Sequence, residues 1–407
     1  MALDSPNSIT RYIMLAMVLG IISGAVFGAA AAPLGIVGSL YIQLIKVVAV
    51  PLVFVSIIDA ILSTSLSLKT ARRWLGIITI NAGCALMIGL ALANLIRPGV
   101  GFSALGALGQ ASLAPALKEF SLKTFLENLV PKSVVSPFSE NNIIAVALMA
   151  LLIGVTLRQY LNSKHSELSS QQAQRGSRII SGVVNAMIVH LVKLVPLAVF
   201  CVTAKTVGES GFAPFKGLLQ YVGVACLGLL LQIILVYPWW IIRIGGISLK
   251  RFWSAAARPV AYAFGTNSSL ATVPLTLQAL DDLGVSKSAS RLATCIGTNL
   301  NNDGILLYEA LAVLFVAQAL GVELSLGEQV FAAVMSLFAA IGVAGVPEAG
   351  VVSLSLVLTA VGLPLEIVPL LLSVDWIVAR MRSVTNVLSD MTVSIAVAGR
   401  QDRGLMG

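Results

Sequence analysis

Long apolar segments dominate the first part of the chain. They lie near residues 12–32, 37–62, 74–97, 142–158, 179–207 and 218–243. A helix needs ~20 apolar residues to cross the hydrocarbon core of a bilayer. Charged residues make up only 11% of this chain, against roughly 25% in soluble domains. The sequence therefore predicts an all-α polytopic membrane protein, with these segments as its first six spans.

Basic residues gather in alternate loops between these spans. The clusters follow the second, fourth and sixth spans and include Lys69, Arg72, Arg158, Arg175, Arg243 and Arg251. Since basic loops stay in the cytoplasm, we expect both termini there, in a plasma (inner) membrane. The loops also account for the net charge of +8, so we expect no nucleic-acid partner. We expect the first apolar segment to be retained as a span and not removed as a signal peptide.

Beyond residue 250 the apolar pattern is interrupted twice. Stretches 252–282 and 325–364 are broken by turn-prone clusters at 265–274 (GTNSSLATVP) and 342–350 (GVAGVPEAG). We expect limbs of ~10–15 residues, too short to cross a bilayer at ~1.5 Å per residue. Such limbs predict two re-entrant helical hairpins, since irregular backbone at membrane depth is tolerated where it lines a cavity or lies inside protein. Two kinked spans are the alternative.

Each predicted hairpin precedes an apolar helix that contains polar groups. In residues 288–320 the interruption is the NLNNDG stretch at 299–304, and in residues 365–398 it is a set of ionisable side chains. The order hairpin, helix, hairpin, helix is an internal repeat. Interrupted segments in corresponding positions of two halves indicate the binding site of a transporter.

The last of these helices places polar side chains on one face. Asp375, Ala379, Arg382, Asn386 and Asp390 follow one another at intervals of 4, 3, 4 and 4 residues, which is helical spacing. Each charge at mid-membrane costs ~2.5–3.5 kcal/mol, so these groups need partners, a substrate or ions. Internally paired structural ions are the alternative explanation.

Such residues suit recognition of an anion and not catalysis. Arg382 offers a planar fork that binds a carboxylate with two hydrogen bonds, and the N–H groups at hairpin tips also favour anions. Asp303 and Asp390, with asparagine oxygens, can supply an all-oxygen site for a hard cation such as Na⁺. We therefore expect a carboxylated solute accompanied by cations.

Other chemistries have weaker support in the sequence. It contains no GxxxxGK[ST] phosphate loop, no CxxC spacing and only two histidines, so we expect neither ATP-driven transport nor a zinc site. A membrane-embedded enzyme would need a general base beside Ser268 and Ser269, and His190 lies in a different span. No cofactor is expected besides the coupling ions, Na⁺ and/or H⁺.

Several motifs together resemble one transporter family. The family's patterns are matched by LIKVVAVPLVF at 44–54, SSLATVP at 268–274, NNDG at 301–304, GVPEAG at 345–350, and VDW at 374–376 with TNVL at 385–388. The chain is identified by these motifs as similar to the glutamate/aspartate transporters, the dicarboxylate/amino acid:cation symporters.

The resemblance implies eight transmembrane helices plus two re-entrant helical hairpins, in an elevator-type transporter fold that is usually a homotrimer. Residues 1–250, with spans 1–6, would form mainly the scaffold and oligomerisation region, although spans 3 and 6 would move with the transport domain. Residues 251–400 would form the core transport region, with hairpin 1, span 7, hairpin 2 and span 8.

The resemblance also implies a site, residue by residue. Arg382 would bind the distal carboxylate of the substrate and Asn386 its main carboxylate. The substrate-binding positions would be Ser268, Ser269, Ala344, Gly345, Ala379, Arg382, Ser383 and Asn386. The cation-binding positions would be Gly297, Asn301, Asp303, Asn386 and Asp390, with Na⁺ held at the last four.

Departures from the family pattern bear on the substrate and the ions. Ala379 stands where the family's amino-acid carriers place an aspartate for the amino group. The substrate would then be a dicarboxylate without an amine, unless Glu348 supplies the missing charge. Hydroxyl ligands of the family are absent at Ile78, Asn81, Ala82, Ala340 and Val343. These losses leave the number of sodium ions open.

Glu309 follows Tyr308 at the position where proton-coupled members of the family carry a glutamate. A buried carboxyl group there is a candidate proton carrier, and permanent pairing with Arg380 or Arg382 is the alternative. The sequence thus predicts an ion-coupled secondary active symporter that imports acidic solutes, either a C4-dicarboxylate or an acidic amino acid such as glutamate or aspartate. An uncoupled, channel-like anion conductance on the same fold and a neutral amino-acid symporter are the alternatives.

Overall fold

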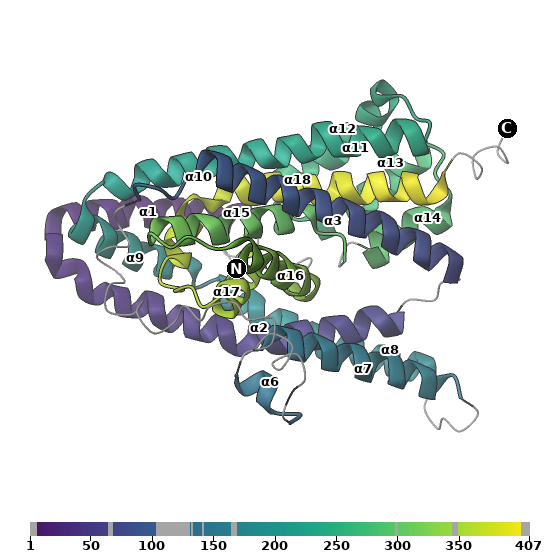
Figure 1. Ribbon diagram of the computed structural model, residues 1–407, viewed down its shortest axis with the longest axis horizontal. Coiled ribbons are helices and arrows are strands. Elements are labelled where there is room, and N and C mark those ends of the chain that lie inside the picture. The colour runs from purple at the N-terminus through teal and green to yellow at the C-terminus, as the bar shows by residue number, and fades with distance from the viewer. Residues whose placement is uncertain are drawn as a thin grey trace.

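Every regular element in the described part of the chain is a helix (Figure 1). The computed structural model describes residues 6–63, 68–102, 131, 133–140, 142–163, 169–297, 300–343 and 349–399. The predicted all-α class is confirmed for these residues.

The first half of the chain forms helices close to the predicted spans. These are α1 (Pro6–Phe27), η1 (Gly28–Leu34), α2 (Gly35–Ser63), α3 (Leu68–Ile96), the short α6 (Ser136–Ser139), α7 (Ile143–Leu161), α8 (Ser170–Val192), α9 (Val195–Ser210) and α10 (Ala213–Leu231). Within the described residues, four stretches are long and apolar enough to cross a membrane: Arg11–Gly38, Arg72–Ile96, Ser170–Glu209 and Gly217–Ile244.

The predicted span at 179–207 lies within the candidate span Ser170–Glu209 but contains a break. The helix is interrupted at Lys193 and Leu194, and α9 begins directly afterwards with Pro196 in its first turn. Proline lacks a backbone N–H and is tolerated in the first turn of a helix, where that N–H would have no partner. The break therefore falls where a new helix can start on a proline.

The sixth predicted span changes its winding part-way. After α10 the chain continues as the π-helix η2 (Gln232–Val236), the short α11 (Tyr237–Trp239) and the π-helix η3 (Trp240–Ile244). Single π-turns inside α-helices are rare and occur frequently at functional sites. They redirect the side chains that follow them.

The first predicted hairpin is present as α12 (Leu249–Thr266) packed against α13 (Ser269–Asp282). The turn between them is only Asn267, in the left-handed region at φ 52°, and Ser268, whose Oγ accepts a hydrogen bond from the N–H of Ala271 at 3.1 Å. The predicted break at 265–274 was therefore too wide. Thr266 is the last residue of α12, and its hydroxyl donates to the Tyr262 carbonyl at 2.8 Å.

The second predicted hairpin is present as α16 (Leu326–Val343) packed against α17 (Ala349–Ala360). The first arm of each hairpin has 18 residues, and the second arms have 14 and 12. The predicted limb length was wrong for the two first arms, which reach ~27 Å at ~1.5 Å per residue. Polar residues at a hairpin tip mark the turn but do not end a helix by themselves.

The helix after the first hairpin is broken within the polar stretch 299–304, where the sequence predicted an interruption. The short α14 (Lys287–Arg291) leads into the π-helix η4 (Leu292–Ile296), Asn301 and Asn302 are not helical, and α15 (Asp303–Ala319) follows. α15 begins at Asp303 and is buried along most of its length. The break before it therefore lies in the interior of the bundle, with the Asp303 carboxylate and the backbone groups of the helix start.

α18 (Val368–Ala398) is the central helix of the structure (Figure 1). It packs against α3, α9, α10, α12, α13 and α15, whereas α7 and α8 lie at one edge of the bundle against α2. Its residues up to Val378 belong to one apolar cluster, and those from Val384 onward belong to a second. The polar part of α18 therefore lies where the two apolar clusters meet.

Candidate functional site

Arg382 is buried in the middle of α18 beside an aromatic ring and a carboxylate. Its Nη2 donates to Asp375 Oδ2 at 2.6 Å, and the two side chains are 5% and 1% exposed. Its Cζ lies 3.9 Å from the centroid of the Tyr308 ring, a cation–π contact. Internal pairing, one of the two explanations for the charges of this helix, is confirmed for Arg382. The flanking Arg380 donates to the Trp376 carbonyl at 2.8 Å.

Both hairpins reach α18 at this point. A Cβ added at Gly350, in the first turn of α17, would overlap the guanidinium nitrogens of Arg382. Ser383 Oγ donates to Asn267 Oδ1, at the turn of the first hairpin, at 3.1 Å. The start of α17, in the second hairpin, thus lies directly against Arg382, and the first hairpin is hydrogen-bonded to the neighbouring residue, Ser383.

The predicted substrate-binding residues fall into three groups. Ala379, Arg382, Ser383 and Asn386 share the polar part of α18, and Ala379 is 3% exposed. Ser268 and Ser269 lie at the first hairpin turn, where the Ser268 hydroxyl caps its own helix. Ala344, Gly345 and Glu348 lie outside the described residues.

Asn386 ties α18 to the start of α15. Its Oδ1 accepts a hydrogen bond from the N–H of Gly304 at 2.9 Å, and its Nδ2 donates to Asn302 Oδ1 at 3.4 Å. A Cβ at Gly304 would come within 2.7 Å of the Arg382 carbonyl oxygen. Only glycine permits this approach, which places the broken end of α15 against the Arg382 turn.

The predicted cation ligands meet one turn further along α18. Asn301 Nδ2 donates to Asp390 Oδ1 at 3.0 Å, and Ser389 Oγ lies 3.1 Å from Asn301 Oδ1 and 2.6 Å from Asp303 Oδ2. Gly297 is buried, and its carbonyl accepts from the N–H groups of Leu300 and Asn301. The structure therefore brings the side chains together, while the Gly297 carbonyl caps the break.

These residues form one buried group, which we call the central cluster. It comprises Asn301, Asp303, Arg382, Asn386 and Asp390, each no more than 5% exposed. One guanidinium, two carboxylates and two carboxamides in an apolar bundle can bind a carboxylate at one end and a cation at the other. Burial makes each of these groups costly without such partners.

Two further residues contact the central cluster from η2 and α11. Gln232 Nε2 and the Tyr237 hydroxyl donate to Asp303 Oδ2 at 3.3 Å and 3.1 Å. Sequence reasoning missed both residues. The available signal was a single carboxamide in the apolar run at 229–236, since an isolated polar residue inside a span is a functional candidate.

Glu309 lies in α15, next to the second hairpin, and is fully buried. The hydroxyls of Ser336 in α16 and Ser353 in α17 adjoin it, but each donates to a carbonyl of its own helix. Neither carboxyl oxygen has a well-formed hydrogen bond among the described residues, and no ion pair of that part of the chain includes Glu309. The alternative explanation, permanent pairing of Glu309 with Arg380 or Arg382, is not observed among these residues.

Comparison with known proteins identifies the family. The model of the sodium:dicarboxylate symporter family matches residues 9–400. The chain is 30% identical over 400 residues to the C4-dicarboxylate transport protein of Aeromonas salmonicida, covering 96% of this chain and 92% of the relative. Proteins of that name from Paraburkholderia phymatum and Burkholderia ambifaria are 28% and 29% identical, over 95% of this chain and 91% and 90% of theirs. The chain belongs to the sodium:dicarboxylate symporter family.

Membership of this family confirms the resemblance found in the motifs, and the match covers nearly the whole chain. The protein is an integral membrane transporter and not an enzyme.

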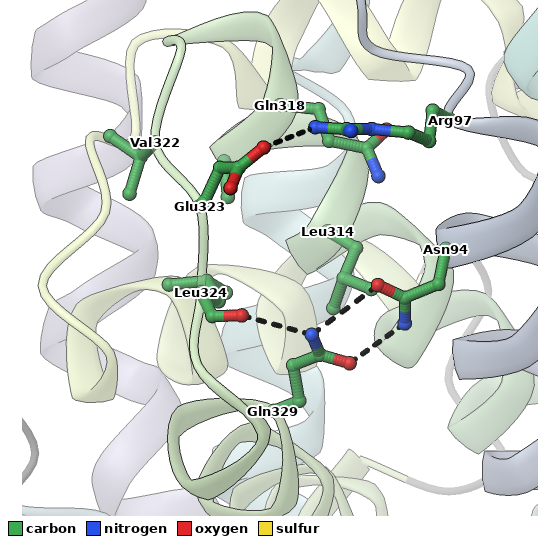
Figure 2. A pocket seen from close by; sticks show the side chains of 9 residues that line it. Asn94, Arg97, Leu314, Gln318, Val322, Glu323, Leu324 and Gln329 are labelled. Atoms are coloured by element: carbon green, nitrogen blue, oxygen red, sulfur yellow. Dashed lines mark hydrogen bonds and ion pairs between the residues drawn. The ribbon is translucent and has the colours of Figure 1, made fainter.

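A second polar region of this symporter-family chain shares no residue with the central cluster and is shown in Figure 2. A cavity of ≈ 180 Å³ lies between the end of α3, α15 and the start of α16. We call it the peripheral pocket, after its polar lining residues Asn94, Arg97, Gln318, Glu323 and Gln329. Asn94 and Gln329 exchange two hydrogen bonds, at 2.8 Å and 3.4 Å, and Arg97 pairs with Glu323 at 2.7 Å.

Proposed function

We propose that this protein is an ion-coupled secondary active symporter that imports C4-dicarboxylates. The observation that carries the proposal is the buried Arg382 guanidinium, which lies under the second hairpin and beside the apolar Ala379. A guanidinium in a water-poor site binds a carboxylate strongly and with defined geometry. The names of the relatives, C4-dicarboxylate transport proteins, support the same substrate class.

Ala379 is the residue that favours a dicarboxylate over an acidic amino acid. It precedes Arg382 by three residues on the same face and is 3% exposed. A substrate ammonium group placed there would meet a methyl group, and an unpaired buried charge is strongly destabilising. One carboxylate would bind Arg382, and the other would bind Asn386 with Ser268, Ser269 or Ser383 at the first hairpin.

The proposed coupling ions are Na⁺ and/or H⁺. Asp303, Asp390, Asn301 and Asn386 offer side-chain oxygens, the ligand type that hard cations prefer. Glu309 is the proposed proton carrier, since it is buried between α15 and both arms of the second hairpin. A cation bound near the substrate also offsets the charge of the carboxylates.

Transport would follow an elevator mechanism with alternating access. The proposed moving part is residues 251–400 with α3 and α10, which pack against α15 and α18. The proposed scaffold contains α2, α7 and α8, whose apolar side chains include the exposed Leu152 and Val183. Such faces fit lipid and the neighbouring subunits of a homotrimer, in a plasma (inner) membrane with both termini cytoplasmic.

Uptake by purified protein in liposomes tests this proposal. Labelled succinate, aspartate, glutamate and serine would each be offered under a Na⁺ gradient or a pH gradient alone. We expect concentrative uptake of succinate, and current without accumulation would indicate an anion conductance instead. Ala379→Asp should shift preference from succinate toward aspartate, because it supplies a counter-charge for the amine. Equal uptake of succinate and aspartate by the unmodified protein would refute the role of Ala379.

A further inference from the structure

The π-helical turn η2 carries a side chain that contacts the central cluster and has no assigned role. Gln232 is the first residue of η2, and Tyr237 is the first residue after it. Gln232 is fully buried and Tyr237 is 1% exposed. Both donate to the same atom, Asp303 Oδ2. Their positions depend on how this short stretch is wound.

Winding decides whether residues 232 and 237 can share a partner. In an α-helix of 3.6 residues per turn, residues five apart point about 140° away from each other. In a π-helix the hydrogen bonds run from residue i to residue i+5, so residues five apart lie nearly one above the other. The π-turn at 232–236 therefore places the Gln232 amide and the Tyr237 hydroxyl on one side, facing α15.

The two oxygens of Asp303 are treated differently. Oδ2 accepts from Ser389 at 2.6 Å, Tyr237 at 3.1 Å and Gln232 at 3.3 Å. Oδ1 has no hydrogen-bond partner among the described residues. The orientation of the Gln232 amide is determined by its second contact, the Asn81 carbonyl at 3.3 Å, because two acceptors require the nitrogen.

The charge of this carboxylate is not balanced within the described residues. All three donors to Asp303 are neutral, and the ion pairs of the described chain do not include it. Burying a charge or a polar atom without a partner costs several kcal/mol. The Gln232 Oε1 and the Asn81 side chain also lack hydrogen-bond partners in this part of the structure. The region is rich in oxygen atoms and short of positive charge.

We propose that Gln232 and Tyr237 are positioning residues for the coupling cation. They hold Asp303 through Oδ2, with Ser389, and so present Oδ1 as the cation ligand in a fixed direction. This role rests on the proposed cation coupling and adds to it the elements that set the affinity for the ion. The Tyr237 hydroxyl also lies 3.2 Å from the Thr385 carbonyl, which competes with Asp303 for its single proton, so a purely structural role for the tyrosine has to be distinguished by the test.

Tyr237→Phe and Gln232→Leu remove the donors and keep most of each side-chain volume. Matched controls are Tyr41→Phe, a buried tyrosine in α2, and Gln318→Leu, whose amide donates to the Ala93 carbonyl in the peripheral pocket. Two quantities would be measured for each purified protein in liposomes or detergent. The first is the half-maximal Na⁺ concentration, measured both for succinate uptake in liposomes and for thermal stabilisation in detergent. The second is the KM for succinate at saturating Na⁺.

We expect each donor variant to raise the half-maximal Na⁺ concentration about tenfold, equivalent to ~1.4 kcal/mol, with the succinate KM changed less than about twofold. A structural role alone would lower thermal stability in Na⁺-free buffer and leave the Na⁺ dependence unchanged, and that result would overturn the inference. So would an equal Na⁺ shift in the control variants. If the unmodified protein responded to Na⁺ neither in uptake nor in stability, the Na⁺ coupling of the proposed function would fail, and this role with it.

Discussion

Two arginine–carboxylate pairs of nearly equal length lie in opposite environments of this protein. Arg382 and Asp375 are 2.6 Å apart in the central helix with side chains 5% and 1% exposed. Arg97 and Glu323 are 2.7 Å apart in the peripheral pocket with side chains 50% and 79% exposed. Geometry alone does not separate the two pairs. Their surroundings determine what each contributes.

The difference lies in the cost of removing one partner. An exposed pair is screened by water and contributes about 0–1 kcal/mol, whereas removing one partner of a buried pair costs about 3–5 kcal/mol. Under the proposed function, a substrate carboxylate would therefore have to take the place of Asp375 without leaving Arg382 unpaired. The peripheral pair joins the end of α3 to the loop before α16. Because it is exposed, it contributes little to stability and would contribute little to binding a solute.

The largest effect is expected at the central pair. Arg382→Lys keeps the charge but loses the planar fork and the contact with the Tyr308 ring. We expect succinate uptake below saturation to fall about a hundredfold, equivalent to ~2.7 kcal/mol, measured as initial rates in proteoliposomes. Succinate should also no longer raise the melting temperature of the purified variant. Normal uptake would refute the assignment of Arg382 as the carboxylate receptor.

A smaller and more selective effect is expected at Glu309. Glu309→Gln keeps the shape of the side chain but removes the group that can carry a proton. Uptake driven by a pH gradient without Na⁺ should disappear, while exchange of internal for external succinate persists. Glu323→Gln in the peripheral pocket is the matched control and should leave both activities intact. Unaltered pH-driven uptake in Glu309→Gln would exclude the proton-carrier role.

Sequence reasoning located the central cluster because charged residues are rare inside apolar membrane segments and are easily recognised there. Asp375, Arg382 and Asp390 stand out in an apolar segment, and their helical spacing places them on one face whatever the rest of the chain does. The break before Asp303 was visible for the same reason. These are local properties of the chain, and local patterns predict them.

Other contacts could not be predicted, since they depend on winding and on distant partners. Gln232 and Tyr237 meet Asp303 across 71 and 66 residues of sequence, and only the π-turn brings the two onto one side. The length of the first arm in each hairpin also escaped prediction, since α12 runs from Leu249 to Thr266 and α16 from Leu326 to Val343. The choice of Asp375 as the partner of Arg382 depends equally on packing.

The smallest effect is expected at the peripheral pair, and it tests the comparison most directly. Arg97→Lys repeats at the pocket the substitution made at Arg382, with the same loss of the planar fork. Because both side chains of this pair are exposed, we expect less than about a twofold change in succinate uptake and at most about 1 kcal/mol of stability. Thermal unfolding and initial uptake rates, measured beside Arg382→Lys, provide the check. A loss of uptake as large as that of Arg382→Lys would place the peripheral pocket on the transport path. Burial would then not distinguish the functions of the two pairs.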